Sequence, residues 1–234
     1  MPESVQSELN WRPAGPLRGM GIVLIGAAVL QVPVMAHHPT AKTPDVARAI
    51  EQLRAIAPLS AWVHGVLILL MLIAFYALVE FSLYRGLHRG QIRAGLIAYA
   101  LGVLAMTGAA LISGFVTTHV AILTPTANEM DLRMTGQILV LCGVLNRALA
   151  SLGAIAMSVG IALWSLDLLS GGRFARVLGV LGILIGSVTA TALVSGTLRL
   201  DVHGMLLVVV LQSIWTAGVG VLLLEAGSGA TSGQ

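Results

Sequence analysis

The sequence contains little charge. Charged residues make up 10% of its 234 residues, whereas hydrophobic residues make up 57% and the mean hydropathy is +0.93. A soluble domain of this length needs a much larger share of charged residues to keep its surface hydrated. The composition therefore excludes an ordinary soluble protein and indicates a membrane protein.

Cysteine is also scarce, and no basic cluster is present. Cys142 is the only cysteine, so an intrachain disulfide is excluded and cysteine usage indicates no compartment. The net charge is +3, but the basic residues lie between apolar runs, where they set membrane orientation, rather than in one patch. We therefore expect no binding to nucleic acid.

Six apolar runs dominate the chain. They cover residues 17–35, 61–84, 94–118, 148–169, 174–198 and 202–224. At about 1.5 Å per residue, each run can cross a hydrocarbon core of about 30 Å as a helix. The runs are continuous rather than alternating, which disfavours the strands of a barrel. We predict an all-α integral membrane protein, a bundle of about six transmembrane helices over residues 17–225, with tails at 1–16 and 226–234.

The short connections indicate the orientation. The connection after the second run and the connection after the fourth run carry arginines and no acid: Arg85, Arg89, Arg93, Arg173 and Arg176. Short loops rich in Lys and Arg remain in the cytoplasm. We expect a multi-pass protein of a bacterial-type inner (plasma) membrane, with both termini cytoplasmic.

Two segments on the expected outer side have sequence patterns that predict helical structure. Residues 44–57 repeat apolar residues on one face, which predicts a short amphipathic helix on the outer surface that ends at Pro58. Residues 127–147 are mostly apolar up to Leu145. They fit either a re-entrant or surface helix or an outward extension of the fourth span, and the sequence leaves both open.

Small residues predict close helix packing. The fifth span carries Gly179, Gly182 and Gly186 at spacings of three and four, and the fourth span carries a stripe of serine and alanine. Such stripes allow helix backbones to approach closely in lipid, where hydrophobicity does not drive helices together.

Charged residues are absent from the middle of the predicted spans. A transporter driven by protons or sodium ions usually needs a carboxylate or a broken helix near the midplane, so this class is disfavoured, and a passive transporter or channel stays open. The sequence also lacks a nucleotide-binding P-loop, a zinc-protease motif and a serine-nucleophile motif. No enzyme class is indicated.

Histidines gather at the expected outer face, where five of the six are predicted: His37, His38, His64, His119 and His203. Neutral imidazole is a common ligand of iron, copper and zinc. His64 and His119 lie on consecutive antiparallel spans and are the first candidates for metal ligands. His203 and His37 are the alternatives. Histidine also suits the membrane interface without any ligand, which is the competing explanation.

These histidines lead to a hypothesis about function. We expect a membrane redox protein that holds b-type haem on its outer side, with Arg147 and Arg199 pairing with the propionates. Copper is the alternative, since methionines are expected at a similar depth. Such a protein transfers electrons or is a small membrane subunit of an oxidoreductase complex. Alternatives are a non-catalytic accessory subunit and a passive transporter or channel. The expected partners are the lipid bilayer and other membrane-protein subunits.

Overall fold

The computed structural model describes residues 14–39, 43, 45–124 and 128–229, and in these residues the only regular structure is helical. Six helices are long and apolar enough to cross a membrane, which confirms the predicted all-α membrane bundle. The elements are α2 (Ala14–Ala36), α3 (Val46–Arg85), α4 (Gly90–Leu111), the π-helical turn η2 (Ile112–Val116), α5 (Thr117–Leu123), α6 (Glu129–Leu168), α7 (Arg173–Val194) and α8 (Val202–Gly229).

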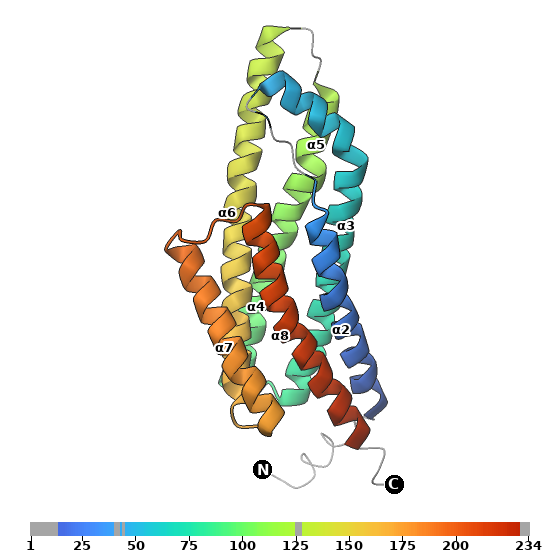
Figure 1. Cartoon of the computed structure of the whole chain (residues 1–234), viewed down its shortest axis with the longest axis vertical. Coiled ribbons are helices and arrows are strands. Elements are labelled where there is room, and N and C mark those ends of the chain that lie inside the picture. Colours follow the sequence, from blue (N-terminus) through green and yellow to red (C-terminus); the bar gives the residue numbers. More distant parts are fainter. Residues whose placement is uncertain (1–13, 40–42, 44, 125–127, 230–234) are drawn as a thin grey trace.

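The helices differ greatly in length. α3 and α6 have 40 residues each, whereas α2 has 23 and α7 has 22. At about 1.5 Å per residue, 40 residues extend about 60 Å, twice the thickness of a hydrocarbon core. Since η2 and α5 continue α4 without a break, these elements form a third long span. Figure 1 shows the short helices in one half of the molecule and the long ones projecting beyond them.

The predicted outer helix at residues 44–57 is part of α3. Residue 44 lies outside the described residues, and Asp45 caps the helix by accepting a hydrogen bond from the Arg48 N–H at 2.9 Å. The prediction that Pro58 ends this helix is wrong, because Pro58 lies inside α3. A proline within a helix removes one backbone bond and bends the helix. The first part of α3 accordingly crosses the end of the bundle before the helix turns along it (Figure 1).

One arginine fastens this crossing part of α3 to the end of α5. The Arg54 Nε donates to the Ala121 carbonyl at 2.7 Å, and its Nη2 donates to the Thr124 carbonyl. The last carbonyls of a helix have no partner within the helix, and a basic side chain can satisfy them. Arg54 therefore stabilises the end of the long α4–η2–α5 span.

The structure answers the question left open at residues 127–147. α6 is continuous from Glu129 through the fourth span, so the described part of this segment is an extension of the span rather than a re-entrant or surface helix. Asn128 caps it by accepting a hydrogen bond from the Asp131 N–H at 2.8 Å, and residue 127 lies outside the described part of the chain.

Three helix boundaries differ from their predicted positions. α2 begins at Ala14, inside the predicted tail, of which residues 1–13 are not described. α7 ends at Val194 rather than at 198, because Gly196 adopts a φ of 72°, a conformation that terminates helices. α8 continues to Gly229, so the predicted tail from 226 is helical up to that residue.

The predicted close packing of the fourth and fifth spans is confirmed. A Cβ atom added to Gly186 of α7 would overlap the Ser158 carbonyl of α6 and lie 3.0 Å from the Ala162 Cβ. A Cβ atom on Gly182 would overlap the Ser165 hydroxyl and the Trp215 ring. Both glycines therefore let α7 lie directly on α6, as expected for small residues in a membrane bundle.

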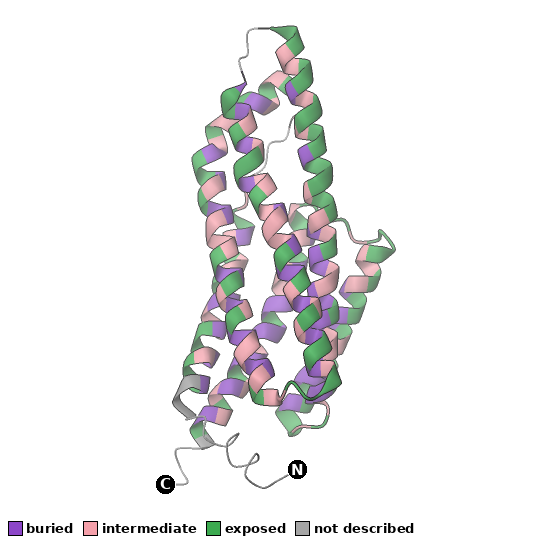
Figure 2. Ribbon diagram, turned by 180° about the vertical axis from the view of Figure 1, so that it is seen from behind, coloured by how far each residue is buried: buried purple, intermediate pink, exposed green. Residues whose placement is uncertain are grey.

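The buried core lies in the half of the molecule that contains all six spans. Trp164 of α6 and Trp215 of α8 are fully buried and stack with ring centroids 5.9 Å apart, and Tyr99 of α4 lies 5.1 Å from Trp164. Figure 2 shows buried residues concentrated in this half and mostly exposed ones on the projecting ends. The six-span half is therefore the packed part of the molecule.

One end of the bundle contains a buried ion cluster. The Asp167 side chain is 1% exposed and accepts from the Arg85 Nε at 2.6 Å and from the Arg89 Nη1 at 2.7 Å. Asp167 thus joins the α3–α4 turn to the end of α6. We call this the arginine-rich end, defined by Arg85, Arg89, Arg93, Arg173 and Arg176.

Replacing Asp167 with Asn should destabilise the protein. The arginine side chains are 20% and 41% exposed and can regain water, so we expect a loss of about 1.5–3 kcal/mol in the free energy of unfolding, the range for hydrogen bonds to charged groups. Thermal unfolding in detergent measures it. Glu129→Gln is the control, because its ion pair is exposed and contributes less than about 1 kcal/mol. Equal shifts for the two variants would contradict this account.

Candidate functional site

A cavity of about 540 Å³ lies where the short helices end against the sides of the long ones. α2 contributes Gln31 and Met35, and the segment before α8 contributes Leu200 and Asp201. α3, α4, η2, α6 and the first half of α8 form the walls. The cavity is lined mainly by apolar side chains, with a few polar groups among them: Gln31, His38, His64, Ser113, Asn146, Arg147, Asp201 and Gln212. This combination is typical of ligand sites.

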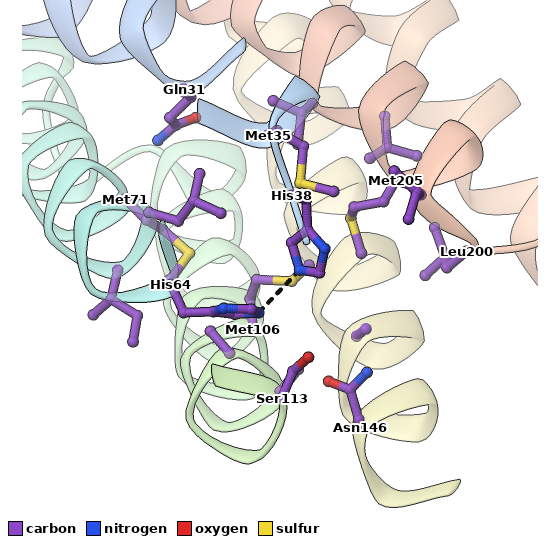
Figure 3. Close-up of a pocket in the computed structure, with 18 of the residues that line it drawn as sticks. Gln31, Met35, His38, His64, Met71, Met106, Ser113, Asn146, Leu200 and Met205 are labelled. Carbon is purple, nitrogen blue, oxygen red and sulfur yellow. Dashed lines mark hydrogen bonds between the residues drawn. The ribbon is translucent and has the colours of Figure 1, made fainter. Parts of the chain in front are cut away.

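Two histidines meet in this cavity. The Nε2 atoms of His38 and His64 are 2.9 Å apart, and the two rings are inclined at 72°. Figure 3 shows the rings pointing toward one another from the segment after α2 and from α3. Imidazoles from two separate elements therefore converge on one point.

The backbone fixes the orientation of the His64 ring. Its Nδ1 donates to the carbonyl of Ser60, one turn earlier on α3, at 2.8 Å. With the proton on Nδ1, the Nε2 of His64 has a free lone pair that accepts a hydrogen bond from the Nε2–H of His38. A bond from the second ring nitrogen to a backbone carbonyl is the usual arrangement behind a metal-ligating histidine.

Both rings are shielded from solvent. His64 is 3% exposed and His38 is half-buried. Burial, and after it the neighbouring His64, lowers the pKa of His38 to about 4. The His38 ring is therefore neutral at pH 7, the form that binds metal ions. Its Nδ1 is buried and has no hydrogen-bond partner among the described residues.

Methionines line the same cavity as the two rings. Of the nine methionines in the sequence, five line it: Met35, Met71, Met106, Met157 and Met205. Figure 3 labels Met35, Met71, Met106 and Met205 on the walls around the imidazoles. Methionine often serves only to fill irregular gaps. In a cavity that also holds two imidazoles, these side chains can supply sulfur donors beside the nitrogen donors.

The π-helical turn η2 makes room for His64. A Cβ atom on Gly114 would lie 2.5 Å from the Cβ and Cγ atoms of His64, so only glycine permits this approach. The hydroxyls of Thr117 and Thr118 donate to the carbonyls of Ile112 and Gly114 at 2.7 and 3.0 Å and satisfy the loosened backbone. Single π-helical turns within α-helices occur frequently at functional sites.

The predicted site residues fall into two groups. His64 and Arg147 line the cavity. Among the described residues the other four do not line it. His119 is exposed on α5, and His203 and Arg199 are exposed near the start of α8. His37 is also exposed, and its Nδ1 donates to the Pro33 carbonyl at 2.8 Å. Ligation by these residues stays a prediction. The ring that meets His64 is His38.

Sequence reasoning placed His38 at the outer face but did not select it as a ligand. His37 and His38 are adjacent, and only the end of α2 at Ala36 decides which of them turns into the cavity. Met35, which is buried and lines the same cavity, is the one nearby signal in the sequence.

The spacing of the two nitrogens restricts the ligand. With metal–nitrogen bonds of about 2.0–2.1 Å, two ligands of a tetrahedral ion lie about 3.3–3.4 Å apart, and two opposite ligands lie about 4 Å apart. The His38–His64 distance of 2.9 Å is that of an N–H···N hydrogen bond, so the two nitrogens would separate by about 0.4 Å to hold a tetrahedral ion. In the described part of the chain, no three His, Cys, Asp or Glu residues are grouped to hold a metal ion. The cavity offers methionine sulfurs as further soft donors.

No protein-family model matches the sequence, and no curated protein and no solved structure is significantly similar to it. The residues of the cavity are therefore the basis for assigning a function.

The Gly114→Ala substitution should displace His64. The added Cβ atom overlaps the His64 side chain, so we expect faster modification of His38 and His64 by diethyl pyrocarbonate, measured by peptide mass spectrometry. Gly65→Ala is the control, because the nearest atom to its added Cβ is 3.9 Å away. Unchanged rates in the Gly114 variant would show that the close approach does not hold the pair together.

Proposed function

We propose that this multi-span membrane protein binds a transition-metal ion, with Cu(I) preferred, through His38, His64 and methionine sulfur. It serves in electron transfer or as a small metal-holding subunit of a membrane oxidoreductase complex. The observation that carries the proposal is the 2.9 Å approach of two imidazole Nε2 atoms inside a cavity lined by methionines.

The donor set favours a soft ion. Thioether sulfur together with imidazole suits Cu(I), whereas structural zinc sites use four ligands drawn mostly from cysteine and histidine. Cys142, the only cysteine, is not among the residues that line the cavity. Methionines of the cavity wall thus take the place that thiolates have in zinc sites.

A b-type haem is the second occupant that we consider. Opposite axial ligation of its iron requires the two ring nitrogens to separate to about 4 Å. Arg147 lines the cavity and could pair with a propionate. The observed spacing of the imidazoles supports the smaller ion over haem.

The orientation in the membrane belongs to the same proposal. Five arginines at the arginine-rich end support its position on the cytoplasmic side of a bacterial-type inner membrane, by the positive-inside rule. α2 begins and α8 ends near this end of the molecule (Figure 1), which supports a cytoplasmic position for the start of α2 and the end of α8. The metal site then faces the outer side.

Cu(I) titration of the purified protein in detergent, against a chromogenic chelator and without oxygen, tests the site. We expect one high-affinity ion per chain. His38→Ala and His64→Ala should each weaken binding by more than about 100-fold, because loss of a ligand costs more than loss of a second-shell partner. His119→Ala and His203→Ala are the matched controls and should bind as the wild type does.

A second pair of variants tests the sulfur ligands. Met106→Leu should weaken binding, whereas Met130→Leu should not, because Met130 is 74% exposed and does not line the cavity. Equal affinity of all these variants would overturn the proposal. A Soret band in protein purified from its own membrane would show that the bound cofactor is haem rather than copper.

One observation favours the accessory-subunit function as a second candidate. The outward extension of α6 exposes large apolar side chains beyond the length needed to cross a membrane: Met130, Met134, Ile138, Val140, Leu141, Val144 and Leu145. Extended apolar surfaces of this kind mark sites of protein association. An accessory subunit without a cofactor would bind no Cu(I) and show no Soret band, which separates the two functions.

A further inference from the structure

A second cavity, of about 190 Å³, lies at the arginine-rich end between α3, α6, α7 and α8. It has room for about six water molecules by volume, or for a short length of hydrocarbon chain. Its lining residues are mostly apolar, among them Phe81, Ala175 and Leu223, and Tyr84 and Arg85 are its polar side chains. A mostly apolar cavity with an arginine in its wall fits an amphiphile rather than a free ion.

The charges around this cavity are mainly positive. Arg85 binds Asp167 through Nε and Nη2, and the same carboxylate also binds Arg89, so two cations share one anion. Arg173 and Arg176 are exposed on either side of Ala175, which lines the cavity. Two further acids are adjacent in sequence to lining residues: Glu80 precedes Phe81 on α3, and the exposed Glu225 precedes Ala226 on α8. With Asp167 they make three acids against Arg85, Arg89, Arg173 and Arg176, so one positive charge remains for an anionic ligand.

We propose that this cavity binds a phospholipid with an anionic headgroup. Part of an acyl chain fills the apolar cavity, and the phosphate lies against Arg85, Arg173 and Arg176. Guanidinium groups match the geometry of phosphate oxygens, and basic pockets between transmembrane helices bind anionic headgroups. The proposal goes beyond the metal site and does not depend on it.

Lipid retention measured by native mass spectrometry tests the proposal. The full-length protein is placed in nanodiscs of equal parts phosphatidylglycerol and phosphatidylcholine, released into detergent, and its bound lipids are counted. We expect about tenfold more retained phosphatidylglycerol than phosphatidylcholine. Equal retention of the two lipids would overturn the proposal.

Two variants locate the site. Ala175→Leu fills the cavity, and the double variant Arg173→Gln, Arg176→Gln removes two exposed charges that form no ion pair among the described residues. In each variant the retained amounts of phosphatidylglycerol and phosphatidylcholine should become about equal. Ala148→Leu and the double variant Arg48→Gln, Arg133→Gln are the matched controls, because all three positions are exposed and lie away from this cavity.

The outcomes separate a lipid from a free anion. Because the arginine variant changes only exposed side chains, its result stands even where Ala175→Leu lowers the thermal stability in detergent. An unchanged preference in the arginine variant would place the lipid elsewhere and overturn the proposal. Displacement of the bound lipid by millimolar inorganic phosphate would also overturn it, because the site would then recognise the phosphate alone.

Discussion

A hydrocarbon interior offers no hydrogen-bond partner to a peptide group, so each segment that crosses it must close its backbone bonds on itself. This constraint makes all six spans helical, but it sets only a minimum length. α7 is close to that minimum, whereas α3 and α6 are nearly twice as long. The short helices therefore end beside the long ones. The polar ends of the short helices face the sides of the long helices, and the larger cavity lies where the short helices end.

The histidine pair depends on how the local backbone ends and bends. α2 stops at Ala36, which turns His37 back onto the Pro33 carbonyl and directs His38 into the cavity. On the opposite wall, Ser60 fixes the His64 ring and the absence of a side chain on Gly114 makes room for it. Without a metal, two neutral imidazoles can share one N–H···N bond. To bind a tetrahedral ion, the same two nitrogens would separate by only about 0.4 Å.

Much of this architecture could be predicted from the sequence, because hydrophobic run length and small-residue spacing are local signals. The six spans and the packing of Gly186 on α6 follow from them. The continuation of α3 through Pro58 could not be predicted, because a proline bends one helix and ends another depending on whether tertiary contacts hold the following turns. Here Arg54, one turn before Pro58, is bonded to the end of α5.

The site was predicted only in part for a related reason. Sequence places histidines at a level of the membrane, but their direction depends on where each helix ends. His64 points inward because it lies on the face of α3 that packs against Gly114 of η2, and His119 lies exposed on the projecting α5. Five methionines around one cavity come from α2, α3, α4, α6 and α8, which no spacing along the chain would reveal.

The central claim concerns the atoms that coordinate the metal. X-ray absorption spectroscopy at the copper edge, on the purified protein loaded with one equivalent of Cu(I), observes them directly. The account predicts a first shell with imidazole nitrogen from two histidines and at least one sulfur, and loss of one imidazole in His38→Ala. A first shell of oxygen and nitrogen without sulfur, or a shell that is the same in His38→Ala, would contradict it.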